Sequence, residues 1–194
     1  MPSGLFIEGY AIVSEDGMLA NAAGVMPPSL RFEADHQFFE RALEGVAAVV
    51  NGRHSNERQP NSVLRRRLIV TRRAPAIATD PANEKALLWN PAGASFEQAL
   101  AALNVSSGRI AVIGGTDVFG LFLDRYDVFF LSRAPGVRLP GGRPVLPGVP
   151  EQSPEEVLAS HGLAPGERRM LDAVKNVAVV AWKRPGLAKP SNSL

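Results

Sequence analysis

Two adjacent glycines, Gly114 and Gly115, stand where an apolar run gives way to a helical pattern, an arrangement suited to binding phosphate. Residues 109–113 are predicted to form a strand and residues 117–123 a helix. Because glycine has no Cβ, the backbone of the turn between them can approach a ligand closely. The free N–H groups and positive dipole end of the helix then point at that ligand. A plain strand-to-helix turn has the same pattern, so the motif alone does not decide between the two.

A second glycine turn follows residues 46–50, a short apolar stretch that we interpret as a strand. The turn contains Gly52, Arg53, His54 and Ser55. Ligands bind at the carboxyl ends of strands in open α/β sheets, where Arg53 could donate two hydrogen bonds to a phosphate. The alternative is a surface turn with an exposed arginine. Two such turns in one chain favour a dinucleotide site more than either turn does alone.

A third predicted strand, residues 68–71, ends in Thr71 and is followed by Arg72 and Arg73. Arginines at this position suit the extra phosphate that distinguishes NADPH from NADH. Three more arginines, residues 65–67, precede the strand. For two of them the better interpretation is a solvent-exposed basic side chain at the start of the strand. Nucleic-acid binding is a weaker alternative, because the formal net charge of the chain is only +2.

Asp35 is the carboxylate best placed to do chemistry. It lies within residues 31–44, which are predicted to form a helix, close to aromatic side chains. A carboxyl in such surroundings can have a raised pKa and can bond the N–H groups of a heterocycle. An exposed helix aspartate is the commoner case when the residue is considered alone. Phe32, His36, Phe39 and Leu43 stand at helical spacing in this segment, and His36 could face the core or solvent.

The remaining pattern predicts an α/β fold with a mixed, mostly parallel central sheet flanked by helices on both faces. An antiparallel edge is expected, because the last strands follow one another without a clear helix between them. Residues 18–30 are predicted to be a loop, and residues 135–154, rich in proline and glycine, to be irregular. Ser95 is predicted to cap a helix that ends at Leu103. Further strands are predicted at residues 7–13, 86–89, 128–132 and 177–182.

Length and composition bound the class of protein. The 194 residues contain no cysteine, which excludes disulfides, thiolate metal sites and a cysteine nucleophile. The three histidines have no metal-ligand spacing, and no apolar run approaches the roughly 20 residues of a membrane span. We therefore expect no metal, no membrane partner and a cytoplasmic location. We also expect one domain over residues 1–183, with a disordered tail at residues 184–194.

In their order and spacing these motifs resemble the dihydrofolate reductase family and its relatives, the pyrimidine reductases of riboflavin biosynthesis. The resemblance extends over roughly residues 5 to 150, and its specificity comes from the order of motifs that are weak singly. It is carried by residues 11–20, 25–27, 52–55, 67–72, 112–115, 118–119 and 131–133, together with Asp35 and Phe39.

The resemblance implies that NADPH lies across the carboxyl ends of the strands. The cofactor-binding residues it implies are Ala11, Gly52, Arg53, His54, Ser55, Thr71, Arg72, Ile113, Gly114, Gly115, Thr116, Asp117 and Val118. Among these, the turn at residues 52–55 would lie under the phosphates. Thr71 and Arg72 would point toward the 2′-phosphate of the adenosine.

On the substrate side, the resemblance implies that Asp35 is the catalytic residue that anchors the heterocyclic ring. Phe39 would pack on the ring and Ser132 would support Asp35. Residues 16–28 would form a mobile loop that closes over the nicotinamide, with Met26 near the substrate. Arg65 stands where the family places an arginine for a folate tail carboxylate. A homodimer is expected, because relatives in the riboflavin branch are often dimers.

Some positions depart from the family pattern. Pro28 replaces the usual aromatic residue of the loop, Phe119 stands where tyrosine is common, and residues 140–148 resemble the riboflavin-pathway enzymes more than dihydrofolate reductases. The predicted function is an NADPH-dependent reductase that transfers a hydride to a pterin-like or pyrimidine-like heterocycle. The alternative is a nucleotide-binding module of the same fold that lacks catalysis, which Pro28 motivates. Nucleic-acid binding through residues 65–73 would show itself as steeply salt-dependent affinity.

Overall fold

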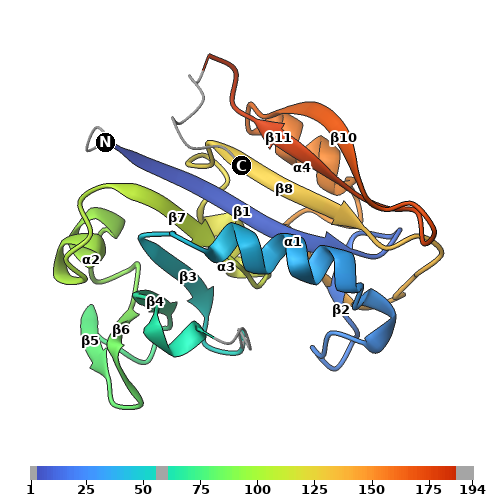
Figure 1. Ribbon diagram of the computed structural model, residues 1–194. Helices are drawn as coiled ribbons and strands as arrows, with labels where there is room; N and C mark the ends of the chain where they lie inside the picture. The colour runs from blue at the N-terminus through green and yellow to red at the C-terminus, as the bar shows by residue number, and fades with distance from the viewer. Residues whose placement is uncertain (1–3, 56–60, 187–194) are drawn as a thin grey trace.

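The protein is built around a nine-stranded sheet, seen in a computed structural model that describes residues 4–55 and 61–186 (Figure 1). Its strands, in chain order, are β1 (Leu5–Val13), β3 (Ala48–Gly52), β4 (Arg67–Val70), β5 (Ile77–Asp80), β6 (Asn83–Trp89), β7 (Gly108–Val112), β8 (Val128–Arg133), β10 (Ala164–Asp172) and β11 (Val177–Lys183). Two short strands, β2 (Met18–Ala20) and β9 (Arg143–Pro144), pair with each other outside this sheet.

The spatial order of the strands is β10-β11-β8-β1-β7-β3-β4-β6-β5. The six strands from β8 to β6 in this order run parallel, whereas β5, β11 and β10 are each antiparallel to a neighbour. The prediction of a mixed, mostly parallel sheet with an antiparallel edge is therefore confirmed. Because six neighbouring strands share one direction, the turns that follow them gather at a single edge, which we call the carboxyl edge.

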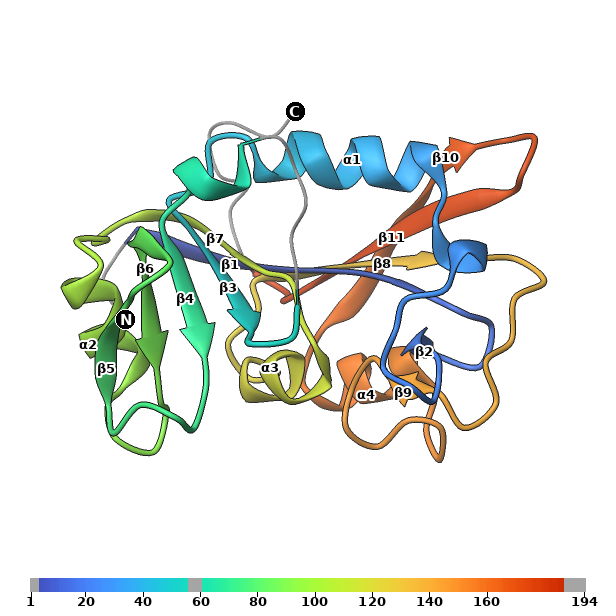
Figure 2. The same ribbon diagram turned by 90° about the horizontal axis from the view of Figure 1, so that it is seen from below.

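Helices cover both faces of the sheet, as predicted. They are α1 (Glu33–Leu43), α2 (Phe96–Ala102), α3 (Thr116–Leu121) and α4 (Pro154–Ser160), with 3-10 turns η1 (Pro28–Leu30) and η2 (Ser62–Leu64). Helix α1 lies alone on one face, and α3 and α4 lie on the other (Figure 2). None of the helices in the described part of the chain is long and apolar enough to cross a membrane.

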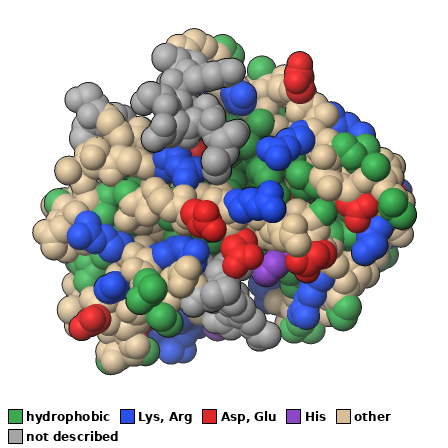
Figure 3. Space-filling model, in the orientation of Figure 1, with side chains coloured by type: hydrophobic (Ala, Val, Ile, Leu, Met, Phe, Trp, Pro, Cys, Tyr) green, Lys and Arg blue, Asp and Glu red, His purple; other side chains and the backbone are tan. Residues whose placement is uncertain are grey.

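The face under α1 is held by aromatic packing. Tyr10 of β1 stacks on Phe130 of β8 with ring centroids 4.9 Å apart, and Phe38 and Phe39 of α1 pack against the Tyr10 ring at 6.3 Å and 5.9 Å. Aromatic pairs at such distances add to the stabilisation that apolar burial supplies. The outward side of α1 presents acidic, basic and histidine side chains (Figure 3). The helix is thus held through one apolar face.

Two helices begin with a capping box, in which a serine side chain and a residue three positions later satisfy each other's backbone N–H groups. Ser95 and Gln98 form one at the start of α2, which confirms Ser95 as the predicted cap. Ser153 and Glu156 form the other at the start of α4, with Pro154 in the first turn. Helix α4 was not predicted, because this signal lies beside the proline-rich residues 135–154.

Several predictions about local structure were wrong. Residues 18–30 are not all loop, since they contain β2 and η1, and β2 forms only by pairing with the distant β9. Of the residues at helical spacing on α1, His36 is exposed, and Phe38, which was not among them, packs inward. Strands β5 and β10 were not predicted. Most of the predicted disordered tail, residues 187–194, lies outside the described residues.

Candidate active site

The two glycine turns that were predicted to bind phosphate are joined at the carboxyl edge. The backbone N–H of Gly52, at the end of β3, donates to the carbonyl of Gly114 at 2.7 Å. The N–H of Ile113 donates to the carbonyl of Val50 at 2.9 Å. Because β3 and β7 are paired neighbours in the sheet, these bonds continue their ladder into the turns. Two turns that lie about sixty residues apart in the sequence thus form one backbone surface.

Gly114 and Gly115 need to be glycine for different reasons. Gly114 has a φ of 102°, and a Cβ there would lie 2.8 Å from the Phe119 ring, so another residue would be both strained and crowded. A Cβ on Gly115 would meet no atom within 4 Å. Gly115 is also the N-cap of α3, and no side chain caps that end of the helix. The outer surface of the turn is therefore bare backbone that a ligand can approach.

The predicted residues in the first turn of α3 take three separate positions. The Thr116 hydroxyl donates to the carbonyl of Pro144 and so ties the turn to β9. Asp117 is exposed. Val118 is buried, and its Cγ2 lies 3.4 Å from the point where a Gly52 Cβ would stand. Val118 thus packs the two turns together from below.

The turn after β3 presents two polar side chains to solvent. Arg53 and His54 are exposed, and the Arg53 guanidinium lies 2.8 Å from Nε2 of His54. The N–H of Ser55 donates to the carbonyl of Gly52 at 2.9 Å, which closes the turn. The side-chain amide of Asn51 donates to the carbonyls of both Gly52 and Ser55. The turn is thereby held in one shape while the side chains of Arg53 and His54 face outward.

Asn51 and Arg67 support this turn, and neither was singled out from the sequence. Both are buried, and Nη1 of Arg67 donates to Oδ1 of Asn51 at 2.7 Å. A small cavity of about 170 Å³ opens between this pair and the residues Arg53, Ser55 and Ser62. A polar Asn51 at the end of an otherwise apolar strand was the signal that could have identified the pair, since buried polar side chains need partners.

The third predicted turn, at the end of β4, lies beside the second, because β3 and β4 are paired. Thr71 is buried, its N–H donates to the carbonyl of Trp89 at 2.9 Å, and its hydroxyl accepts from the N–H of Arg73 at 3.2 Å. Arg72 and Arg73 are exposed. Three exposed arginines, including Arg53, therefore stand at the carboxyl ends of two adjacent strands.

Asp35 lies in the first turn of α1, half-buried beside β8. Burial raises the pKa of its carboxyl above the ordinary value of 3.8, although a hydrogen bond from Ser132 and the nearby charge of His36 act in the opposite direction. Ser132 is buried near the end of β8. The structure thus brings the predicted acid and its predicted support together, at the same edge as the glycine turns.

The other predicted substrate residues surround this position less tightly. Phe39 is half-buried and packs its ring on Tyr10. Met26 is 37% exposed, and its carbonyl accepts from Nη2 of Arg31 at 3.2 Å. Ala11 is half-buried. It packs against the hydrophobic core cluster that includes buried residues of α3 and α4.

The loop that precedes Met26 is anchored at its start and open further on. The Asp16 carboxylate accepts from the Ser14 hydroxyl at 2.6 Å and from the N–H of Leu139 at 3.0 Å. Burial acts to raise the pKa of Asp16, but these hydrogen bonds outweigh it and hold the pKa below its ordinary value. Residues 22–26 are exposed. The exposed part of the loop that was predicted to be mobile is therefore its second half.

Comparison of sequences finds no matching family model and no curated relative. Comparison of structures finds dihydrofolate reductase from Enterococcus faecalis, in a complex with NADP(H) and RAB-propyl, at a TM-score of 0.61 and 17% identity, covering 93% of this chain and 96% of that one. It also finds a protein from Shewanella sp. PV-4 named for riboflavin biosynthesis, at a TM-score of 0.59 and 16% identity, covering 92% and 98%.

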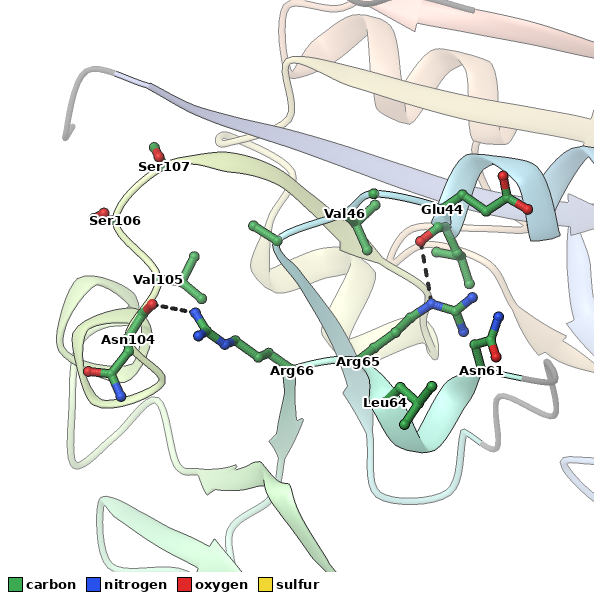
Figure 4. Close-up of a pocket in the computed structure, with 13 residues that line it drawn as sticks. Glu44, Val46, Asn61, Leu64, Arg65, Arg66, Asn104, Val105, Ser106 and Ser107 are labelled. Carbon is green, nitrogen blue, oxygen red and sulfur yellow. Dashed lines mark hydrogen bonds between the residues drawn. The ribbon is translucent and has the colours of Figure 1, made fainter.

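The chain has the dihydrofolate reductase-like fold. In this fold the glycine turns and Asp35 lie at one edge of the sheet. Arg65, which was also predicted to bind the substrate, lies elsewhere. Nε of Arg65 donates to the carbonyl of Leu43 at 3.4 Å, at the opposite end of α1 from Asp35. Leu43 follows Asp35 by eight positions, which corresponds to about 12 Å along the helix. Arg65 lines a cavity with a volume of about 580 Å³ (Figure 4).

Proposed function

We propose that this protein is an NADPH-dependent reductase that transfers a hydride to a pterin-like or pyrimidine-like heterocycle. The observation that carries the proposal is a half-buried carboxyl, Asp35, hydrogen-bonded by Ser132 at the same sheet edge as two joined glycine turns. A bare backbone surface that can bind phosphate and a carboxyl of raised pKa at one edge of the sheet suit a reaction that needs both a nucleotide cofactor and a proton.

The residues present fit NADPH. The bare backbone at Gly115 leaves room for a pyrophosphate, since no atom lies within 4 Å of its missing Cβ. Arg53 and Arg72 are exposed at adjacent strand ends and can bond phosphate groups, including a 2′-phosphate. NADPH would supply the hydride when bound. The similar fold of a dihydrofolate reductase complexed with NADP(H) supports the same assignment.

The task of Asp35 follows from its surroundings. Because its pKa is raised, the carboxyl retains a proton to higher pH than an exposed aspartate does. It can accept from ring N–H groups when ionised and donate to a ring nitrogen when protonated. Ser132 fixes the orientation of the carboxyl, and the aromatic packing of α1 on Tyr10 holds the helix that carries it. These residues bind and orient the ring and hold a proton beside it.

Both substrate classes keep support. Asp35 and the similar fold of a dihydrofolate reductase favour a pterin. The sequence of residues 140–148 and the similar fold of the protein named for riboflavin biosynthesis favour a pyrimidine. Arg65 gives less support to a folate, because its guanidinium bonds the far end of α1. A panel that contains dihydrofolate, simple reduced pterins and ribosylamino-pyrimidines separates these classes.

The test is NADPH oxidation measured with that panel for the wild-type protein and for Asp35→Asn. We expect at least one heterocycle to be reduced, and Asp35→Asn to lower turnover by about 100-fold or more, the usual range for a positioned acid–base group. The dissociation constant for NADPH should stay unchanged, because Asp35 does not lie in the glycine turns. Glu33→Gln, an exposed change on the same helix, is the matched control and should retain wild-type turnover.

A second candidate function is a nucleotide-binding module without catalysis. The observation that favours it is the exposed loop at residues 22–26, which leads to Pro28 where related reductases carry an aromatic residue. This module would bind NADPH and reduce no member of the panel. Unchanged turnover in Asp35→Asn with an active substrate would instead remove Asp35 from the reaction.

A further inference from the structure

A cavity of about 580 Å³ lies at the amino ends of the parallel strands, at the opposite edge of the sheet from the glycine turns. Its walls come from three segments that each precede a parallel strand: residues 43–47 before β3, residues 61–66 before β4 and residues 104–107 before β7. We call this region the amino-edge cavity. The five residues of β3 separate it from the turn at Gly52 by about 16 Å. The cavity is therefore distinct from the site assigned to NADPH.

The size and walls of the cavity suit a small organic molecule. Its volume of about 580 Å³ falls within the range of ligand pockets, which is roughly 300–1,000 Å³. Val46, Leu64 and Val105 contribute apolar surface, and 61% of Leu64 is exposed. Asn61 adds a side-chain amide that can donate hydrogen bonds, and the backbone of residues 104–107 forms the facing wall (Figure 4). An amphipathic ligand would bury its apolar part against the apolar side chains and bond the amide.

The charge of the lining is positive. Arg65 and Arg66 enter the cavity from adjacent positions and extend in different directions, toward α1 and toward Asn104 (Figure 4). Nη1 of Arg66 donates to the carbonyl of Asn104 at 2.5 Å, which places an exposed guanidinium against the wall formed by residues 104–107. Among the described residues of the lining, Glu44 is the acidic one, and its carboxylate extends away from Arg66 (Figure 4).

We propose that the amino-edge cavity binds a small amphipathic anion, a carboxylate or phosphate ester with an apolar body, through Arg66. A guanidinium has five N–H donors in a planar fork, so the bond to Asn104 leaves Arg66 able to bond an anion as well. The apolar body would lie against Val46 and Val105. This site shares no residue with the glycine turns or with Asp35, and its one link to the predicted substrate residues is Arg65, which lines the cavity.

The test is a titration of the full chain, labelled with ¹⁵N, with phenyl phosphate, benzoate and the neutral benzyl alcohol, followed by amide chemical shifts. We expect phenyl phosphate, benzoate or both to shift the amides of residues 44–47, 64–66 and 104–107. Benzyl alcohol should bind at least about tenfold more weakly, because it has no charge for Arg66 to bond. The stronger of the two anions identifies the headgroup, phosphate or carboxylate.

Variants assign the binding to Arg66. Arg66→Gln should weaken binding of the anion by about tenfold or more. Ser106→Glu, which retains Arg66 and adds a like charge at the rim, should also weaken it. Arg168→Gln, an exposed change on β10, is the control and should bind as the wild type does. The proposal is overturned if neither anion shifts these amides, if benzyl alcohol binds equally well, or if Arg66→Gln retains full affinity. NADPH added to the same sample should shift residues 52–55 and 113–117, so failure of either site is seen separately.

Discussion

The two halves of the candidate active site are built by different means. The cofactor half consists of turns whose backbones are bonded to each other directly, as Gly52 is to Gly114 at 2.7 Å. The substrate half depends on side chains, with Asp35 on a helix that is held by aromatic packing and Met26 on a loop that is largely exposed. The register of the sheet determines the first arrangement. The second depends on long-range packing, and it leaves more freedom for movement and for variation of the substrate.

The sharpest test of the backbone-built half is a pair of alanine substitutions. Gly114→Ala should lower the free energy of unfolding by about 1–3 kcal/mol, because φ is 102° and the new Cβ would lie 2.8 Å from Phe119. Gly115→Ala should cost little stability, since no atom lies within 4 Å of its Cβ. It should nevertheless weaken NADPH binding, because the new methyl group would occupy the space beside the backbone that the pyrophosphate needs. Urea unfolding and NADPH titration measure the two effects. Equal stability losses would contradict the distinction drawn between the two glycines.

Removal of a single charge tests the 2′-phosphate assignment. Arg72→Gln should weaken NADPH by about tenfold and leave NADH nearly unchanged, because only NADPH carries the phosphate that Arg72 is proposed to bond. Parallel titrations with the two nucleotides give the ratio directly, and Arg168→Gln on β10 serves as the control. Equal weakening of both nucleotides would exclude this role for Arg72.

The side-chain-built half predicts a shift in pH dependence. The hydrogen bond from Ser132 lowers the pKa of Asp35 against the effect of burial, so Ser132→Ala should raise that pKa further. The limb of the pH–rate profile that reports Asp35 should then move to higher pH. A profile that loses amplitude without moving would mean that Ser132 acts only through packing.

The smallest expected effect concerns stability. The pKa of Asp35 is higher in the folded state than in the unfolded state, so the folded state binds its proton more tightly. The stability that results is present below the unfolded pKa and is lost as the pH rises through the folded pKa. Asp35→Asn removes this loss, and it should be at least as stable as the wild type near neutral pH. Denaturant unfolding at acidic and neutral pH tests this, and a variant that is less stable at neutral pH would contradict it.

The arrangement of the glycine turns could be predicted from the sequence because each of its parts is local. Glycines, arginines and a threonine directly after apolar strands predict turns at one edge, and parallel strands then bring Gly52 and Gly114 together. The pair of Asn51 and Arg67 was not readable in this way. Its partners lie 16 residues apart, and each residue looks ordinary in its own segment.

Other elements were missed because their local patterns carry little information. Strand β10 is exposed from Ala164 to Met170 and contains proline and glycine, so it exists through pairing with β11 rather than through an apolar alternation. Strand β2 depends in the same way on β9. The orientation of His36 stayed open in the sequence because Phe38 and His36 both fit a helical spacing, and only the position of Tyr10 decides which one packs.

The joined glycine turns and their arginines are proposed to hold NADPH beside Asp35. A parallel titration of the wild-type protein with NADPH and NADH, read by intrinsic fluorescence or thermal shift, tests this binding. We expect micromolar binding of NADPH and much weaker binding of NADH. If neither nucleotide binds, the proposal is wrong, and the turns at Gly52 and Gly114 serve the fold or another ligand.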